Sequence, residues 1–145
     1  MALESALWKR CLTGAKAVRH QGHKLDMQRI ENCATSGHPD IEGCLDGGQF
    51  WIELKSCMRP VRSDTPIRPK TRISQGIWHE KRAKAGCRIA WILIQVGEAN
   101  DARLYLVPGN RYDDITVPEQ QLAEMSVLSP SATCGDVILR AVQGW

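Results

Sequence analysis

The first half of this 145-residue chain changes from a helical to a strand-like spacing of apolar side chains. Residues 3–19 place apolar side chains at helical spacing, so we predict an N-terminal amphipathic helix there. Shorter segments rich in strand formers follow at 27–32, 40–45 and 49–56. Asp46-Gly47-Gly48 lies between the last two, and such dipeptides tolerate the positive φ of tight hairpin turns. A helix followed by three strands is therefore expected.

In the second half of the chain, a proline-rich segment precedes the most apolar run. Residues 58–71 contain Pro60, Pro66 and Pro69, which favours an irregular loop. Residues 73–85 read as a helix that ends at Gly86. The remaining predicted elements are a strand at 88–96 that is apolar on both faces, a strand at 102–107, and helices at 118–125 and 136–142.

This order of elements predicts the fold class. The apolar strand is reached from the third strand through a helix, which is the connection that makes two strands parallel. We therefore expect an α/β protein with a mixed central β-sheet flanked by helices. The length fits a single domain spanning 1–145, and no internal repeat is apparent.

Composition excludes several classes of protein. No stretch approaches the roughly 20 apolar residues that cross a bilayer, and the first residues do not resemble a signal peptide, so we expect no membrane association and a cytoplasmic location. The six cysteines form no C-x-x-C pair, which is typical of reduced, buried cysteines in a cytosolic protein. His20 and His23 are a weak alternative signal for zinc, because no cysteine pair completes four ligands.

Positive charge is concentrated in one part of the chain. The net charge is only +3, but residues 59–88 hold nine basic and two acidic side chains. Such a segment suits a phosphate backbone, although a solvated surface is the alternative. Trp51, Trp78 and Trp91 could stack on bases, with core packing as the alternative. The candidates for phosphate contacts are Arg59, Arg62, Arg68, Lys70 and Arg72 in the loop, and Lys81 and Arg82 in the helix.

Two charged residues interrupt the third predicted strand. If Asp46-Gly47 is a two-residue loop, Leu45 pairs with Gly48 and Asp40 lies opposite Glu53. Opposed residues hold their Cβ atoms about 5 Å apart, so two carboxylates would share one surface. Such a pair needs a raised pKa or a divalent cation. Lys55 projects from the same face as Glu53, about 6.6 Å along the strand.

The loop length decides whether this cluster forms. A Gly47-Gly48 loop sets Asp40 opposite Lys55 and keeps Glu53 on the same face. A three-residue loop slips the pairing by one and moves Asp40 to the other face. With either two-residue loop, the three charged groups converge in a way that suits hydrolysis of a phosphodiester.

These residues carry a family resemblance. Pro39-Asp40 followed by Glu53-Leu54-Lys55 resembles the signature of the PD-(D/E)xK nucleases. Gly37-His38-Pro39-Asp40, together with Ser74-Gln75 at the start of the next helix, is similar to the virus-type replication-repair nuclease branch and to archaeal-type Holliday-junction resolvases. The resemblance covers about residues 27–97 and implies a restriction-endonuclease-like core.

The resemblance also implies roles for individual residues. Asp40 and Glu53 would bind Mg²⁺, or Mn²⁺ as a substitute, with the Leu54 carbonyl as a further ligand. Lys55 would be the catalytic lysine, with Gln75 beside it. A further acidic ligand would come from Glu4 in the first helix or Glu31 in the first strand, and the sequence does not choose between them.

We therefore expect a metal-dependent endonuclease acting on DNA, with branched DNA such as Holliday junctions or flaps as candidate substrates. A homodimer would provide two sites for symmetric cutting, although no sequence feature indicates one. The resemblance suggests a phage or mobile-element origin, and a phage origin would make the location the host cytoplasm. The main alternative is a nucleic-acid-binding module that keeps the fold and does not cut, and a structural zinc protein is the third hypothesis.

Overall fold

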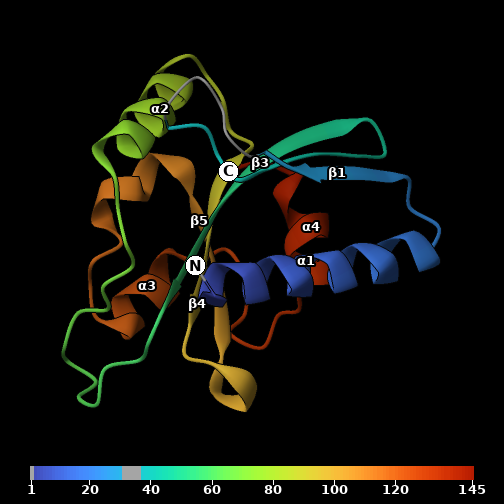
Figure 1. The fold of residues 1–145 in the computed structure, drawn as a ribbon. Coiled ribbons are helices and arrows are strands. Elements are labelled where there is room, and N and C mark those ends of the chain that lie inside the picture. The colour runs from blue at the N-terminus through green and yellow to red at the C-terminus, as the bar shows by residue number, and fades with distance from the viewer. Residues whose placement is uncertain (1, 31–36) are drawn as a thin grey trace.

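A five-stranded mixed sheet forms the centre of the protein (Figure 1). The computed structural model describes residues 2–30 and 37–145. The strands lie in the sheet in the order in which they occur in the chain, and only β3 and β4 are parallel. The strands are β1 Leu25–Arg29, β2 Ile41–Leu45, β3 Gly48–Cys57, β4 Ala90–Val96 and β5 Arg103–Pro108.

Helices cover both faces of this sheet (Figure 1). One hydrophobic core lies between the sheet and helices α1 and α4, and a second lies between the sheet, α3 and the short 3-10 helix η2. The helix α2 packs beside η2, on the same side as α3. The helices are α1 Ala2–His20, α2 Ile73–Lys84, η1 Ala99–Asp101, η2 Gly109–Asp114, α3 Glu119–Met125 and α4 Cys134–Ala141.

The hairpin between β2 and β3 has the predicted two-residue loop. Asp46 and Gly47 both have positive φ, of 50° and 89°, as this tight turn requires. Leu45 pairs with Gly48 and Ile41 with Ile52, so the Asp46-Gly47 register is confirmed. The one-residue slip of a three-residue loop does not occur.

The helical crossover is also confirmed. β3 leads through the proline-containing loop and α2 into β4, which lies parallel to β3. All seven residues of β4 are buried, because helices cover both of its faces. The chain is thus an α/β protein with a mixed sheet.

The predicted boundaries of β1, β4 and α4 differ by two or more residues from those in the structure, and β4 begins at Ala90 instead of residue 88. β1 begins at Leu25, two residues before the predicted start, and the predicted end at Asn32 lies outside the described residues. α4 begins at Cys134 because Thr133 and Asp136 cap it reciprocally. η1 and η2 were not predicted, since such short helices have no hydrophobic periodicity to reveal them.

Two expectations from composition can be compared with the structure. No helix among the described residues has both the length and the apolar character needed to cross a membrane. The described cysteines are free, but only Cys11, Cys57 and Cys134 are buried as predicted, whereas Cys44 and Cys87 are partly exposed. Cys33 lies outside the described residues.

Candidate active site

The candidate site lies on the face of β3 that is turned toward α2. Phe50, Ile52 and Leu54 point into the core beneath α1 and α4, so the alternating residues Glu53 and Lys55 point the other way. Both charged side chains are nearly inaccessible, at 1% and 3% exposure. Buried charges of this kind are rare unless they are paired or have a function.

Gln75, in the first turn of α2, joins these two charged residues. Its Oε1 accepts a hydrogen bond of 2.7 Å from Lys55 Nζ, and its Nε2 donates one of 3.0 Å to Glu53 Oε2. The family resemblance implied a position for Gln75 beside the lysine and the carboxylates. The structure brings the three residues into one hydrogen-bonded cluster.

Asp40 lies at the edge of this cluster, one residue before β2. Its Oδ2 accepts a hydrogen bond of 2.7 Å from the backbone N–H of Leu54. Burial and then the neighbouring Asp40 carboxylate raise the pKa of Glu53 to about 10. Glu53 Oε1 is buried and has no hydrogen-bond partner among the described residues. With this pKa, Glu53 is protonated at neutral pH unless a cation displaces the proton, so the unpartnered oxygen lies beside a second carboxyl group that can share the proton or the cation.

The charge of Lys55 is influenced by acidic residues from three parts of the chain. Burial lowers the pKa of Lys55, while the negative charges of Glu53, Glu4 and Asp40 act in the opposite direction. Glu4 also contributes to the raised pKa of Glu53, so the first turn of α1 reaches the electrostatic field of the site. Glu31, the other candidate, lies outside the described residues.

Tyr112, in η2, is a member of the cluster that the sequence did not reveal. Its hydroxyl donates a hydrogen bond to Gln75 Oε1 and accepts one of 3.0 Å from the backbone N–H of Arg72. Its ring centroid lies 5.6 Å from Lys55 Nζ. The only signal in the sequence was an aromatic residue shortly after a buried strand, which is too common to identify a site.

His79 packs behind Tyr112. The two rings are stacked with centroids 5.5 Å apart, and neither ring nitrogen of His79 has a hydrogen-bond partner in the described residues. Burial, together with the charge of Lys55, lowers the pKa of His79 to about 4. A neutral histidine ring therefore packs against the face of the Tyr112 ring.

A close contact at Gly37 joins the segment 37–40 to the start of α2 at Ser74, the two segments that carry the resemblance. Gly37 has a φ of +89°, and a Cβ atom at this position would lie 2.2 Å from the carbonyl oxygen of Ser74. Only glycine allows this approach without a shift of the backbone. The segment before Asp40 is thereby seated on the first turn of α2, directly beside Gln75.

Divalent-cation binding can be judged from the donors that are present. Asp40 and Glu53 offer hard oxygen ligands, and the unpartnered Glu53 Oε1 fits a cation. No group of three His, Cys, Asp or Glu side chains suited to a metal is assembled within the described residues. Any further ligands would come from a backbone carbonyl such as that of Leu54, from water or from substrate. His23, half of the suggested zinc pair, lies 2.7 Å from Asp46 instead.

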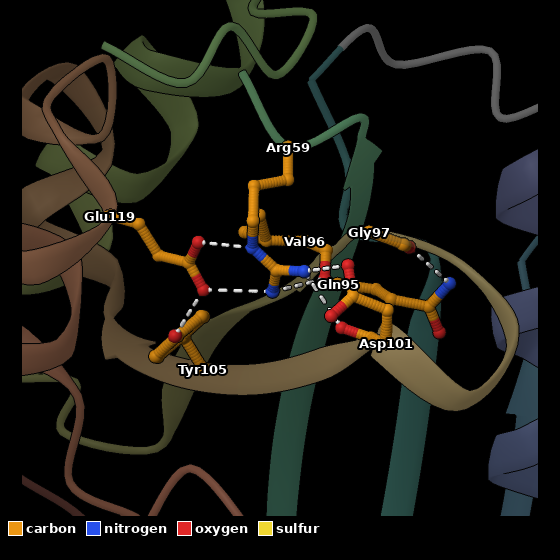
Figure 2. A network of polar contacts seen from close by, with 7 residues as sticks. All are labelled: Arg59, Gln95, Val96, Gly97, Asp101, Tyr105 and Glu119. Carbon is orange, nitrogen blue, oxygen red and sulfur yellow. Dashed lines mark hydrogen bonds and ion pairs between the residues drawn. The ribbon is translucent and has the colours of Figure 1, made fainter. Parts of the chain in front are cut away.

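Arg59 differs from the other basic residues predicted to contact phosphate. Figure 2 shows its guanidinium between Glu119 and Asp101, with a further hydrogen bond to the carbonyl of Val96. The Glu119 carboxylate also accepts a hydrogen bond from Tyr105 and helps to raise the pKa of Arg59. Arg59 thus fastens the start of the basic loop to α3 and η1.

The remaining basic candidates have exposed side chains. Among them, Arg62 forms an exposed ion pair of 3.1 Å with Asp64, which contributes little in water. The exposed residues are Arg62, Arg68, Lys70, Arg72, Lys81 and Arg82.

Comparisons with known proteins do not assign this chain to a family. No protein-family model matches the sequence, and no curated protein matches it. The resemblance to PD-(D/E)xK nucleases therefore depends on the residues described above.

Proposed function

We propose that this protein is a metal-dependent endonuclease that hydrolyses phosphodiester bonds in DNA. The observation that carries the proposal is the buried cluster of Asp40, Glu53, Lys55 and Gln75 with an unpartnered oxygen on Glu53. A buried, charged and incompletely satisfied cluster is costly for folding and is typical of functional sites.

The fold is compatible with this proposal. A mixed sheet with a carboxylate-bearing hairpin, followed by a helical crossover, would correspond to a restriction-endonuclease-like core. Asp40 is only half buried, so a phosphate group could approach the cluster from its edge. Exposed Lys81 and Arg82 on α2 would attract the DNA backbone to the same side.

Each residue of the cluster has a chemical task in the proposed reaction. Asp40 and Glu53 would hold Mg²⁺ or Mn²⁺, with Glu4 and the Leu54 carbonyl as further candidates. The bound cation would supply Lewis acidity and lower the pKa of a bound water. Lys55 would orient the attacking water and offset negative charge as it develops on the phosphate. Gln75 would keep the amine and the Glu53 carboxylate in a fixed relative position.

Cleavage assays test this proposal. Supercoiled plasmid, single-stranded DNA and four-way-junction DNA are incubated with Mg²⁺ or Mn²⁺ and either wild-type protein or Asp40→Asn, Glu53→Gln or Lys55→Met. We expect wild-type protein to cut at least one substrate, and each variant to be slower by about 100-fold or more, because each change removes a ligand or the catalytic amine.

Glu42→Gln is the matched control. Glu42 lies on the same face of the same hairpin, opposite Trp51, but its carboxylate contacts Gln28 at 3.4 Å rather than the site. Circular dichroism confirms that the variants fold. Cleavage by the three site variants at the rate of wild type and of Glu42→Gln would overturn the proposal.

A binding module without catalysis is the second candidate. One observation favours it, namely that the described part of the chain assembles no group of three acidic, histidine or cysteine side chains suited to a metal. Titration with Mn²⁺ separates the two candidates. A nuclease site should bind Mn²⁺ and lose that binding in Asp40→Asn, whereas a pure binding module should bind DNA in a salt-sensitive manner that is indifferent to metal.

A further inference from the structure

Three aromatic rings form a cluster directly beside the candidate active site. The ring centroids of His38, Trp51 and Trp78 lie 5.5 to 5.8 Å from one another. His38 is two residues before Asp40, and Trp51 is two residues before Glu53 on the same face of β3. Trp78 follows Gln75 by one turn of α2. We call these three residues the aromatic platform.

The two tryptophans of the platform differ from the rest of the tryptophans. Trp91 is buried in the core beneath α1 and α4, and Trp8 and Trp145 pack against that core. Trp51 and Trp78 belong to neither hydrophobic core and are only partly buried. Their indole rings instead contact each other between β3 and α2, outside both cores.

A cation accompanies the platform. The guanidinium of Arg82 lies 4.7 Å from the ring centroid of Trp78 and 5.8 Å from that of Trp51. Arg82 is exposed and is one turn beyond Trp78 on α2. Aromatic faces next to a positive charge are the combination with which proteins bind single-stranded nucleic acids, since bases stack on the rings and the cation contacts phosphate.

The platform also contains a buried polar atom without a hydrogen-bond partner. Nδ1 of His38 is buried and has no hydrogen-bond partner among the described residues. Packing alone does not compensate for a buried polar atom without a partner. Glu42 lies opposite Trp51 in the hairpin register, and its negative charge would repel a phosphate. A bound phosphate is therefore expected nearer to Arg82, on the α2 side.

We propose that the aromatic platform of His38, Trp51 and Trp78 binds an unpaired nucleobase of the DNA strand, with Arg82 contacting an adjoining phosphate. A base in a duplex is stacked on its neighbours and cannot lie on the platform, so the substrate class is DNA with at least one unpaired nucleotide next to the cleaved bond. The position of that bond rests on the proposed nuclease function, whereas base binding by the platform does not depend on it.

Binding without metal tests the platform separately from cleavage. A fluorescent 20-nucleotide single strand and a 20-base-pair duplex are titrated in EDTA, and the dissociation constants are measured by anisotropy. We expect Trp78→Ala and Trp51→Ala to weaken single-strand binding by about 10-fold or more, with duplex binding changed by less than about 2-fold. Trp78→Phe, which keeps an aromatic ring, should retain most of the affinity.

Trp145→Ala is the matched control. This tryptophan is also partly buried and has a guanidinium, that of Arg88, 4.8 Å from its ring centroid, but it packs against the core on the other face. It should bind single strands as wild type does. Wild-type affinity of Trp51→Ala and Trp78→Ala for single strands would overturn the platform.

Photo-crosslinking provides a measurement that needs no variant. A single strand carrying 5-iodouracil is irradiated with wild-type protein, and the crosslinked peptide is identified by mass spectrometry. We expect crosslinks in peptides that contain Trp51 or Trp78, while crosslinks confined to other peptides would overturn the platform.

The two proposals can fail separately. Single-strand binding that depends on Trp78 in a protein that never cuts DNA would support the platform and overturn the nuclease. Metal-dependent cleavage with no effect of Trp51 or Trp78 on single-strand binding would support the nuclease and overturn the platform.

Discussion

Tyr112 fixes the orientation of the Gln75 side chain. The amide can donate to Glu53 only if its oxygen faces Lys55, and the Tyr112 hydroxyl donates to that same oxygen. A tyrosine that touches neither the carboxylates nor the expected substrate thus sets the geometry of the groups that do. It is a positioning residue for the proposed reaction.

Removal of the Tyr112 hydroxyl tests this role. We expect Tyr112→Phe to lower kcat for DNA cleavage by about 10-fold with little change in KM, and to cost about 1 kcal/mol of unfolding free energy for the lost hydrogen bonds. The pH dependence of kcat should also shift, because the hydroxyl helps to hold the partner of Lys55.

Tyr105→Phe is the control for that experiment. Tyr105 also donates from its hydroxyl, but to Glu119, in the network shown in Figure 2. This variant should lose stability while keeping kcat and its pH profile. Equal kinetics in the two variants would contradict a positioning role for Tyr112.

His79 makes the stability of the protein sensitive to mild acid. Its pKa is lowered from 6.5 to about 4 because the ring is buried and faces Lys55. The unfolded chain therefore binds this proton more tightly than the folded chain does. The stabilisation is present above pH 6.5 and is lost as the pH falls from 6.5 toward 4, by at most about 1.4 kcal/mol per pH unit.

Substitution by phenylalanine should remove this dependence. Denaturant unfolding of wild type and His79→Phe is measured between pH 4 and pH 7.5, and we expect a shallower loss of stability in the variant over that range. The stacking on Tyr112 is retained, so folding should not be abolished. His20→Phe, at an exposed histidine, should follow wild type, and parallel curves for wild type and His79→Phe would refute the assignment.

At the level of elements, the site depends on the contact between the segment before Asp40 and the start of α2. Gly37 and Gly47 have the same φ of +89°, but only at Gly37 would a Cβ atom meet another group, the carbonyl of Ser74 at 2.2 Å. Nothing lies within 4 Å of a Cβ atom at Gly47. A comparison of substitutions at these two glycines therefore distinguishes the cost of a positive φ from the cost of a steric clash.

We expect Gly37→Ala to lower DNA cleavage by at least about 10-fold and to destabilise the protein by more than Gly47→Ala does. Both variants bear the cost of a positive φ, which is about 1 kcal/mol, but only the first forces apart the segment before Asp40 and the first turn of α2. Cleavage rates and denaturant midpoints of the two variants provide the measurement. Equal rates would show that the contact with Ser74 does not position the site.

At the level of the whole molecule, exposed basic side chains occur on both sides of the sheet. Exposed Arg68 and Lys70 lie on the loop that leads into α2, whereas exposed Lys16 is on α1 and exposed Lys24 follows it. Since α1 covers the other face of the sheet, the two pairs test whether DNA contacts one side only.

The salt dependence of DNA binding distinguishes these pairs. We expect the double variant Arg68→Ala/Lys70→Ala to reduce the slope of log K against log salt concentration by about 1 for each lost phosphate contact. Lys16→Ala/Lys24→Ala removes the same charge and should leave the slope unchanged. Equal slopes for the two double variants would indicate a diffuse attraction by net charge.

The sequence predicts those parts of the fold that depend on local patterns. The Asp46-Gly47 turn determined the register of the hairpin, and the alternation along β3 placed Glu53 and Lys55 on one face. Gln75 followed from a resemblance and not from physics. Local patterns thus sufficed for the strands and for the face that carries the site.

Contacts between distant segments were not predictable in the same way. Arg59 was predicted to contact phosphate because it lies in a basic run, yet its guanidinium is engaged by Asp101 and Glu119, 42 and 60 residues away. Tyr112 reaches Gln75 from 37 residues away, out of a helix too short to show periodicity. No local sequence pattern around these residues indicates either contact.

The hairpin has a consequence for the order of folding. Asp40, Glu53 and Lys55 are carried by β2, β3 and the adjoining residue, whose pairing is local and closes quickly. Gln75 and Tyr112 arrive only when the crossover through α2 has set β4 beside β3, which requires closure of a much longer loop. We therefore expect a chain trapped before that late step to have its acidic residues already in register and no amide to hold them, so that recovery of DNA cleavage during refolding would lag behind formation of the hairpin.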